Sequence, residues 1–490
     1  MYKNYVNGKW VESSSGKTFL STNPANGEAL GELTRSTSKD VDQAVEAASQ
    51  AFDSWRKVPA PRRAEVLFRA GEMMVKRKEE LGRLLTQEMG KVLPEALGDV
   101  QEGIDMTFYM AGEGRRLFGD TVPAELPNKF AMSVREPIGV VGAITPWNFP
   151  FAIPTWKLMP ALVAGNTVVF KPSSETSILA VTLVQILEEA GLPPGTLNLV
   201  LGPGDPTGDA VIGHPGINLV SFTGSTDVGR GILTKTAPSL KRVSLEMGGK
   251  NAILVMDDAN LDLALDGIIW SAFGTSGQRC TAASRIIVHR SVKHRLTDMM
   301  LDRARRLRLG DGLLPGVDVG PVVNRAQLEK VHRYTQIGLK EGAKLLTGGD
   351  SYGGDGCDRG FFYLPTIFDD VDPKMRIAQE EIFGPSTALL GVDSLEEAVA
   401  VNNDVTYGLV ASIYTSDVNK AFTAMRDLKV GIVYVNAGTI GAEIQLPFGG
   451  TRGTSNGHRE AGQAALDVYT EWKSIYVDFS GRLQRAQIDV

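Results

Sequence analysis

Residues 167–201 read TVVFKPSSETSILAVTLVQILEEAGLPPGTLNLVL, and this stretch decides the fold class. It opens with a short apolar run (167–171), continues with a segment of helical character (177–190) and closes with a second apolar run (197–201). Gly191, which two prolines soon follow, is a typical end of a helix. A strand, a helix and a second strand in this order predict a βαβ unit, in which both strands are parallel.

The same alternation continues on both sides of this unit. Further apolar runs lie at 138–145, 219–223, 243–246, 252–255 and 285–288. Repeated βαβ units are typical of a parallel, doubly wound sheet with helices on both of its faces. The sequence therefore predicts an α/β fold.

Two flanking regions complete the predicted organisation. The first hundred or so residues are rich in helix, and one buried stripe is formed by Val41, Val45, Ala48, Phe52 and Trp55 at helical spacing. A second alternating series runs from about 292 to 436, with predicted helices near 292–308, 325–341 and 417–428. We interpret that series as a second α/β domain, and the Gly-rich stretch 348–360, which contains Cys357, as a surface loop.

Composition excludes several classes of function. The chain has 490 residues, of which 43% are apolar and 22% charged, and its net charge is −6. A negative charge gives no reason to expect nucleic acid as a partner, and no apolar run approaches the length of a membrane helix. Two cysteines far apart indicate a reducing, cytoplasmic compartment, and the five histidines show no metal-binding spacing, so no metal site is expected.

Polar residues that follow predicted strands are the first candidates for a site, because ligands of open α/β sheets bind beyond the carboxyl ends of the strands. Asn148, between two prolines, has an amide that can donate to an oxyanion; the alternative is a helix cap. Lys171 ends the next run and can contact ribose or phosphate, or simply face solvent. Gly224 and Ser225 open a further helix, whose N-terminus favours phosphate, although a plain helix cap has the same pattern.

Glu246 and Cys280 are less ordinary. Glu246 ends an apolar strand, where burial raises the pKa of a carboxyl toward the working range of a base. Cys280 follows Arg279 in a turn of small residues, where positive charge and amide donors favour a thiolate. The alternative for any single cysteine is a buried, inert side chain.

Together these motifs resemble the aldehyde dehydrogenase superfamily over essentially the whole chain. The matching motifs are PWNFP (146–150), KPSS (171–174), FTGSTDVG (222–229), LEMGGKN (245–251), GQRC (277–280), EEIFGP (380–385) and PFGG (447–450). The segment after PFGG is one residue longer than the common pattern, which leaves the matching of 451–458 open. The resemblance implies NAD(P)-dependent oxidation of an aldehyde to a carboxylic acid.

The resemblance also implies a role for each matching residue. Cys280 is then the nucleophile, Glu246 the base that activates water, and Asn148 an oxyanion donor together with the Cys280 backbone N–H. Lys157 and Glu460 would relay the proton away from the base. The residues implied to hold the dinucleotide are Thr145, Pro146, Trp147, Lys171, Ser173, Ser174, Gly224, Ser225, Glu381 and Phe383.

Cofactor preference is predicted from one position. Relatives that prefer NAD often carry Glu three residues after the motif lysine, where it binds the adenosine ribose; here that position is Ser174. Serine removes a charge that would repel a 2′-phosphate and leaves Lys171 free to pair with it. We therefore predict NADP as the preferred cofactor and NAD as the second, although Glu175 is adjacent.

The resemblance places the substrate in a tunnel. Its implied lining consists of Phe149, Phe151, Ile153, Trp156, Arg279, Thr281 and the loop 437–446. Arg279 either points into the tunnel and pairs with a distal carboxylate, as in a semialdehyde dehydrogenase, or turns away to a surface carboxylate. The runs 154–157, 171–177 and 450–462 are similar to the branch that includes 2-oxoglutarate semialdehyde dehydrogenases.

Three parts are expected from the family fold. A dinucleotide-binding domain covers 1–118 and 138–248, a catalytic domain covers 249–455, and a small β oligomerisation element joins 119–137 to 470–490. The resemblance implies a homodimer or homotetramer. It also implies that Arg242 and Arg459 hold Glu471 between them.

The sequence also bears on four rival functions. Residues 453–457 formally match the G-x-S-x-G motif of serine hydrolases, but no strand precedes them and His458 lies too near for a triad. A phosphotransferase is excluded because no GxxxxGK[ST] motif occurs. A non-catalytic family member would be expected to lack Cys280, Glu246 or Asn148. A CoA-acylating enzyme stays open, since Glu246 favours hydrolysis without proving it.

Overall fold

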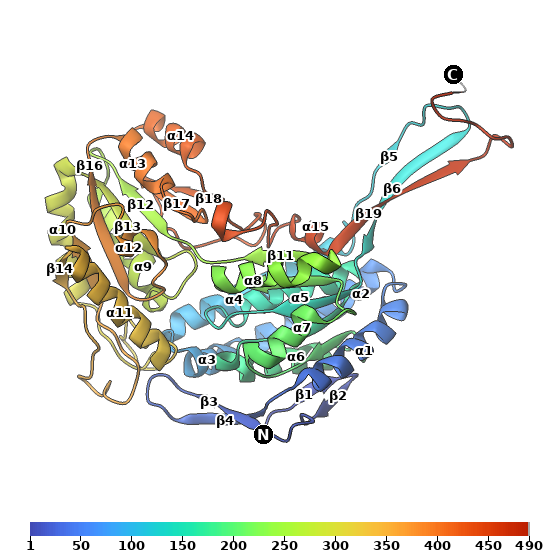
Figure 1. Ribbon diagram of the computed structural model, residues 1–490, viewed down its shortest axis with the longest axis horizontal. Coiled ribbons are helices and arrows are strands. Elements are labelled where there is room, and N and C mark those ends of the chain that lie inside the picture. The colour runs from blue at the N-terminus through green and yellow to red at the C-terminus, as the bar shows by residue number, and fades with distance from the viewer. Residues whose placement is uncertain (489–490) are drawn as a thin grey trace.

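The computed structural model describes residues 1–488, which form two large sheets, a small projecting sheet and the helices that cover them (Figure 1). The helices are α1 Ser38–Trp55, α2 Ala60–Lys76, α3 Lys78–Met89, α4 Leu93–Glu113, α5 Ala152–Ala164, α6 Ser177–Glu189, α7 Asp209–Gly213, α8 Thr226–Thr236, α9 Leu261–Phe273, α10 Arg290–Arg305, α11 Arg325–Glu341, α12 Arg376–Gln379, α13 Leu395–Asn403, α14 Val418–Asp427 and α15 Ala465–Tyr469. Within the described residues, none of these helices is both long and apolar enough to cross a membrane.

The first large sheet has the strand order β11-β10-β7-β8-β9-β1-β2. Its strands are β1 Asn4–Val6, β2 Lys9–Val11, β7 Val140–Ile144, β8 Thr167–Lys171, β9 Leu197–Leu199, β10 Leu219–Thr223 and β11 Arg242–Glu246. The five strands from β11 to β9 are parallel, and β1 and β2 form an antiparallel edge. The predicted runs 167–171 and 219–223 coincide with β8 and β10.

Helices cover both faces of this sheet because its central strands are apolar on both sides. In β8, Val169 packs against α1, α7 and α8, whereas Val168 and Phe170 pack against the layer of α2 to α6. The doubly wound architecture expected from the sequence is confirmed. In α1, the predicted stripe is buried at Val41, Val45, Ala48 and Trp55, while Phe52 is half-buried.

The second large sheet has the order β14-β15-β16-β13-β12-β17-β18 and is parallel except at β14. Its strands are β12 Asn251–Val255, β13 Ala283–His289, β14 Lys344–Thr347, β15 Thr366–Asp369, β16 Ser386–Val392, β17 Val410–Tyr414 and β18 Ile432–Val435. Ile253 and Val255 face α9 and α10, whereas Ala252 and Leu254 face the layer of α11 to α14. The predicted second α/β region is therefore also a covered parallel sheet.

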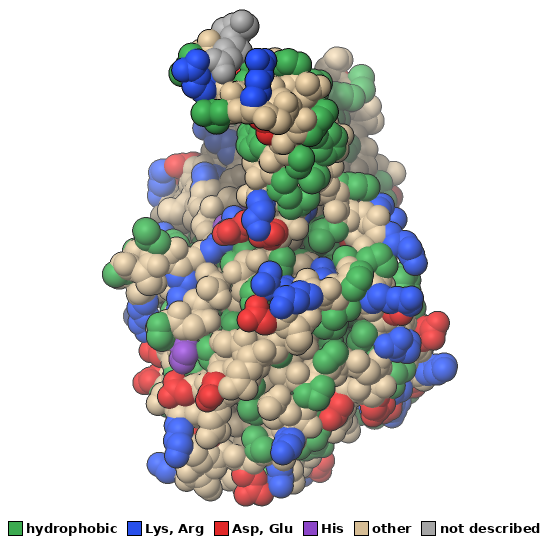
Figure 2. All heavy atoms as spheres, turned by 90° about the vertical axis from the view of Figure 1, so that its right-hand side faces the viewer, with side chains coloured by type: hydrophobic (Ala, Val, Ile, Leu, Met, Phe, Trp, Pro, Cys, Tyr) green, Lys and Arg blue, Asp and Glu red, His purple; other side chains and the backbone are tan. Residues whose placement is uncertain are grey.

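A small antiparallel sheet projects from the body as an arm (Figure 1). It consists of β5 Thr121–Val122, β6 Lys129–Pro137 and β19 Thr470–Asp478, and β19 pairs with β6 along its whole length. Apolar side chains gather on the arm (Figure 2), and the exposed ones include Val122, Phe130, Trp472, Tyr476 and Val477. A separate hairpin of β3 Thr18–Thr22 and β4 Ala29–Thr34 lies near the N-terminus.

One expectation about side chains was wrong, and another holds only in part. Arg242 Nη1 lies 3.9 Å from Glu471 Oε1, but Arg459 donates to the carbonyl of its neighbour His458 and forms no ion pair with Glu471. Most of the loop 348–360 is exposed, as expected, but Cys357 is 2% exposed and packs against Ala25 and Phe362. Arg459 therefore has a local partner, whereas the partners of Cys357 come from tertiary packing.

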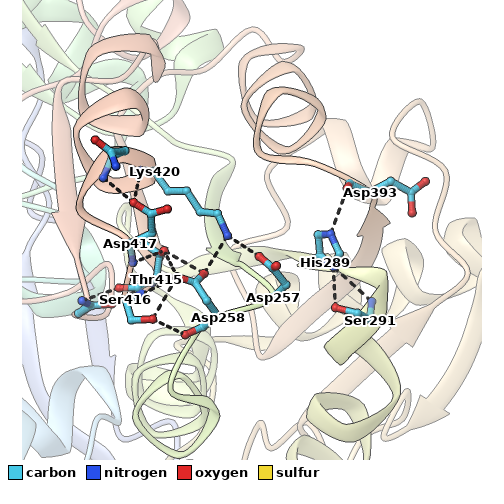
Figure 3. Close-up of polar contacts among 11 residues, drawn as sticks. Asp257, Asp258, His289, Ser291, Asp393, Thr415, Ser416, Asp417 and Lys420 are labelled. Carbon is cyan, nitrogen blue, oxygen red and sulfur yellow. Dashed lines mark hydrogen bonds and ion pairs between the residues drawn. The ribbon is translucent and has the colours of Figure 1, made fainter.

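The carboxyl end of the second sheet carries a network of ion pairs (Figure 3). Lys420 Nζ contacts Asp257 at 2.5 Å and Asp258 at 3.2 Å, and Asp258 accepts hydrogen bonds from Thr415 and Ser416. These groups satisfy one another and join β12 to α14. The predicted site residues lie at the opposite end of this sheet.

Candidate active site

Two cavities meet at Cys280. One, of about 300 Å³, is lined by Glu246, Glu460 and residues of α4 and α5. The other, of about 190 Å³, contains Asn148 and Glu381 in its wall. Four residues belong to both linings: Ile153, Thr223, Met247 and Cys280. Cys280 therefore lies in the walls of both cavities, where it can contact a molecule bound in either one.

The segment before Cys280 is held in a strained conformation. Thr275 and Ser276 have positive φ values of 53° and 55°, a conformation that costs a non-glycine residue free energy. Gly277 also has a positive φ, and a Cβ there would lie 2.1 Å from the carbonyl oxygen of Gly384. Only glycine fits between this turn and the neighbouring chain.

Asn251 anchors the nucleophile segment from the other side. Its Nδ2 donates to the carbonyl oxygens of Cys280 at 2.7 Å and Ala282 at 3.0 Å, and its Oδ1 accepts from the N–H of Val410. Sequence reasoning assigned no role to Asn251. Its position at the start of β12, beside the amino end of β13, was the missing information.

The expected activation of Cys280 by the charge of Arg279 was wrong. Burial, followed by the charges of Glu381 and Glu246, raises the pKa of the Cys280 thiol to about 12. Arg279 does not offset this, because its Nη2 lies 3.4 Å from the buried carboxylate of Glu95. A thiolate at this site needs a further positive charge.

Glu246 ends β11 and is 2% exposed. Burial and the neighbouring Glu460 raise its pKa well above the usual carboxyl value, the direction expected from the sequence. The carboxylate Oε2 accepts from the N–H of Gly450 at 3.3 Å, while Oε1 has no hydrogen-bond partner among the described residues. The unpartnered oxygen leaves Glu246 able to take a proton from a bound water.

A chain of polar groups leads away from this region. Glu460 pairs with Lys157 and accepts from Thr223 at 3.2 Å. Lys157 Nζ also donates to Ser221 Oγ at 3.1 Å, and Ser221 lies 3.0 Å from the Tyr469 hydroxyl. Because Lys157 and Glu460 are both buried, their opposite charges stabilise each other in a region that excludes water.

Asn148 is buried in the wall of the second cavity and does not cap α5. The N-terminus of α5 is instead bound by Asp99, whose Oδ1 accepts from the N–H of Ala152 at 2.8 Å. Lys91 pairs with Asp99 at 2.9 Å and lies 3.8 Å from the centre of the Phe149 ring. Asp99 and Lys91 thus hold the loop that carries Asn148, and the Asn148 side-chain amide stays free for a ligand.

Six of the predicted cofactor residues line the second cavity: Pro146, Trp147, Gly224, Ser225, Glu381 and Phe383. Trp147 and Phe383 meet edge to face with ring centres 5.4 Å apart, and Glu381 Oε1 accepts from the N–H of Gly249 at 2.9 Å. Ser225 is the N-cap of α8, so the positive end of that helix faces the cavity. Sequence reasoning missed Gln327 and Lys330, which no family motif quoted above contains.

The other four predicted cofactor residues, Thr145, Lys171, Ser173 and Ser174, lie outside that lining. Lys171 is 5% exposed, and burial lowers the pKa of its ammonium to about 8. Ser174 Oγ donates to the carbonyl of Gly202 at 3.0 Å. The neighbouring Glu175 carboxylate accepts from Asn324 at 3.0 Å, which fixes its direction.

The first cavity contains five of the predicted substrate residues: Phe149, Ile153, Trp156, Arg279 and Thr281. Phe151 was assigned wrongly, because it is fully buried in the core and would contact a side chain at Gly103 of α4. The loop 437–446 contributes Ile440, Gly441 and Ala442, as expected. Sequence reasoning missed Pro94, Glu95, Gly98, Asp99 and Glu102 of α4, since a helix far away in the chain carries them.

The rival serine motif forms no catalytic site. Ser455 Oγ donates to the carbonyl of His458 at 3.2 Å and accepts from the N–H of Gly457. The same segment runs beside the end of β11, where Ser455 forms an isolated bridge with Glu246. The segment therefore pairs with the backbone of Glu246. Among the described residues, no group of His, Cys, Asp and Glu side chains is arranged for a metal ion.

The chain is similar over nearly its full length to curated enzymes. It is 43% identical to an alpha-ketoglutaric semialdehyde dehydrogenase of Bacillus subtilis (strain 168), covering 97% of this chain and 98% of the relative. It is 46% identical to an alpha-ketoglutarate semialdehyde dehydrogenase of Haloferax volcanii, with the same coverage.

Solved structures agree on the fold. A betaine aldehyde dehydrogenase from Staphylococcus aureus in complex with NAD⁺ is 34% identical, with a TM-score of 0.96 over 99% of this chain and 96% of that one. The sequence model of the aldehyde dehydrogenase family matches residues 10–475. With Cys280 between two cavities and these matches along its length, the chain belongs to the aldehyde dehydrogenase family and is an enzyme that oxidises aldehydes with a nicotinamide cofactor.

Proposed function

We propose that this enzyme oxidises a carboxylate-bearing aldehyde, a semialdehyde of the alpha-ketoglutarate type, to the corresponding dicarboxylic acid. The observation that carries the proposal is the Arg279 guanidinium in the wall of the cavity that opens onto the Cys280 thiol. The two relatives named above, at 43% and 46% identity, bear the name of that substrate. A cavity of about 300 Å³ suits a substrate of that size.

The first half of the reaction forms a thioester on Cys280. The thiolate adds to the aldehyde carbon and gives a thiohemiacetal, whose oxyanion accepts hydrogen bonds from the Asn148 amide and the Cys280 N–H. The oxidised nicotinamide ring, when bound, supplies the positive charge that favours the thiolate and accepts the hydride. Loss of the hydride converts the tetrahedral carbon into the thioester carbonyl.

The second half releases the acid. Glu246 takes a proton from a water molecule, which attacks the thioester carbonyl and breaks its bond to Cys280 Sγ. The pair of Glu460 and Lys157, which lines the same cavity, relays that proton away from Glu246. A CoA-acylating enzyme would transfer the acyl group to a thiol instead.

The second cavity fits a nicotinamide ring and its ribose. The edge-to-face rings of Trp147 and Phe383 offer an apolar wall, and Glu381 offers a carboxylate to the ribose hydroxyls. Gly248 leaves no room for a side chain, since a Cβ there would lie 2.2 Å from Glu381 Oε2. We propose NADP as the preferred cofactor, with Lys171 and Ser174 near the 2′-phosphate and Ser173 and Thr145 beside them.

Three further points belong to the proposal. The division into domains at 1–118 with 138–248, 249–455, and 119–137 with 470–490 follows the three sheets; residues 489 and 490 of the last span lie outside the described residues. The arm, with its exposed apolar side chains, extends a sheet of a second copy in a homodimer or homotetramer. The free thiols of Cys280 and Cys357 suit a reducing cytoplasm.

The deciding experiment measures acid formation from alpha-ketoglutarate semialdehyde and from pentanal, an uncharged aldehyde of equal chain length, with NAD or NADP and without CoA. We expect acid to form without CoA and the semialdehyde to have the higher kcat/KM. Equal kcat/KM values for the two aldehydes would contradict the proposed substrate. Acid formation only when CoA is present, followed by hydrolysis of the acyl-CoA, would contradict the hydrolytic mechanism.

A further inference from the structure

Three carboxylates of α4 face the substrate cavity. Glu95, Asp99 and Glu102 follow one another at intervals of four and three residues, which places them in one row on the helix surface. All three belong to the lining of the cavity that contains Cys280. Their surroundings differ, and the difference separates Glu102 from the other two.

Glu95 and Asp99 are fully engaged. Glu95 accepts from the N–H and the hydroxyl of Thr275 at 2.9 and 3.0 Å and forms the ion pair with Arg279. Asp99 is paired with Lys91 and accepts from the backbone N–H of α5. Each carboxylate has one cation and at least one backbone donor. The two pairs contribute no net charge to the cavity.

Glu102 has no such partner. Among residues 1–488 its carboxyl forms no hydrogen bond and no ion pair, and the side chain is half-buried in the cavity wall. Burial, followed by the charge of Asp99, raises the pKa of Glu102 to about 8. A carboxyl whose pKa is raised keeps its proton to higher pH, and in the protonated form it is a hydrogen-bond donor.

Other groups around Glu102 are accounted for. Lys91 and Arg279 lower its pKa, and Asp105 on the same helix raises it. Burial raises the pKa of Tyr434 in β18 and of the Cys280 thiol, and the charge of Glu102 adds to each rise. Because the charges of Arg279 and Lys91 are balanced by Glu95 and Asp99, ionisation of Glu102 would add an uncompensated negative charge to this side of the cavity.

We propose that Glu102 determines specificity for carboxylate-bearing aldehydes by a proton: its neutral form donates a hydrogen bond to the distal carboxylate of the substrate, and its ionised form repels that carboxylate. This inference rests on the proposed semialdehyde activity. Arg279 and the protonated Glu102 then bind the carboxylate together from two elements, α4 and the nucleophile segment. The only bond that forms is the O–H bond of Glu102: above the pKa of Glu102 the enzyme takes up one proton from solvent when the substrate binds.

The test measures how the ratio of the kcat/KM values of two aldehydes depends on pH. We measure kcat/KM for alpha-ketoglutarate semialdehyde and for pentanal between pH 6.5 and 9.5 and divide the first by the second. The catalytic titration of Cys280 and Glu246 affects both aldehydes alike, and Glu102→Gln reports any remaining effect of their charges on the substrate carboxylate, which stays ionised throughout. In the wild type we expect the ratio to be constant below pH 8 and to fall about tenfold per pH unit well above it.

Glu102→Gln retains a hydrogen-bond donor that cannot ionise, so the ratio of kcat/KM values in this variant should not depend on pH. At pH 9 this ratio should exceed the wild-type ratio about tenfold. Glu102→Ala removes the donor and should lower the ratio at neutral pH with no pH dependence. Glu46→Gln, which removes an exposed charge on α1, should behave as the wild type. Thermal unfolding of each variant checks that it is folded.

The outcomes separate the two proposals. If the wild type shows no preference for the semialdehyde at pH 7, the proposed substrate is wrong whatever the variants do. If the wild type prefers the semialdehyde but the ratio of kcat/KM values falls with pH equally in Glu102→Gln and in the wild type, the proposed role of Glu102 is refuted. The proposed substrate is then unaffected. A ratio that stays flat in the wild type refutes the role of Glu102 as well.

Discussion

The guanidinium of Arg279 lies 3.4 Å from the carboxylate of Glu95, and both side chains are almost fully buried. Thr275 joins them, since its hydroxyl accepts from Arg279 Nε at 2.8 Å and donates to Glu95. The residue next to the nucleophile is therefore bound to α4. Arg279 lines the substrate cavity and has an internal carboxylate partner, an arrangement that neither interpretation of the sequence contained.

Breaking this pair should destabilise the protein. Arg279→Gln leaves Glu95 buried without its cation, and we expect a loss of about 3–5 kcal/mol in the free energy of unfolding. Glu95→Gln combined with Arg279→Gln removes both charges and should recover part of that loss. Urea denaturation of the single and double variants measures both effects. A double variant that is less stable than Arg279→Gln would show that the charge pair is not the cause.

Arg279→Gln should also change substrate selectivity. If the guanidinium binds the distal carboxylate, the substitution should lower kcat/KM for alpha-ketoglutarate semialdehyde about ten- to a hundredfold. Activity with pentanal should change far less. Equal losses on both aldehydes would indicate that Arg279 acts only on the nucleophile segment, through Thr275 and Glu95.

Substitutions of Cys280 and of Glu246 should block the reaction at different steps. Cys280→Ala should abolish turnover, whereas Cys357→Ser should leave it unchanged. Glu246→Gln should form the thioester and stop, which gives a burst of reduced cofactor followed by a low steady state. Rapid-mixing absorbance at 340 nm distinguishes them. An unchanged steady-state rate in Glu246→Gln would remove Glu246 from the role of base.

The release of acid should depend on pH through Glu246. A base must be ionised to act, and burial raises the pKa of Glu246, so the hydrolysis rate of the thioester should increase with pH and decline as pH falls through that raised value. Single-turnover acid formation at several pH values measures it. A hydrolysis rate that is already constant from pH 5 upward would contradict a raised pKa.

Asn148→Ala should slow the reaction on the order of 10²-fold or more, because an oxyanion donor contributes mainly in the transition state. Cofactor affinity, followed by fluorescence titration, should change little. The loop itself should persist, since Asp99 holds the N-terminus of α5 independently of Asn148. A loss confined to cofactor affinity would assign Asn148 to binding instead.

Cofactor preference should respond to position 174. Ser174→Glu introduces a carboxylate that repels a 2′-phosphate and should shift the ratio of kcat/KM values toward NAD. Ser174→Ala removes the hydroxyl that donates to Gly202 without adding charge, so it should leave the preference in place. A wild type that uses NAD far more efficiently than NADP would refute the predicted preference.

The sequence by itself determined the fold class and the chemical groups. Strand β8 and helix α6 follow from residues that are neighbours in the chain: a β-branched apolar run, a helical repeat, and Gly191 after the helix. The local pattern carries this information because strand and helix periodicity depend on adjacent residues. Glu246 was found in the same way, as the polar end of an apolar strand.

Only the tertiary structure decided how these groups meet. Cys280 precedes β13, so the rule that ligands bind beyond the carboxyl ends of strands identifies Glu246 but not the cysteine. Cys280 and Glu246 come together because the amino end of the second sheet faces the carboxyl end of the first. Glu95 reaches Thr275 across 180 residues of chain. Such partners depend on how whole layers pack, so the pKa of Cys280 and the free carboxyl of Glu102 have no local signal in the sequence.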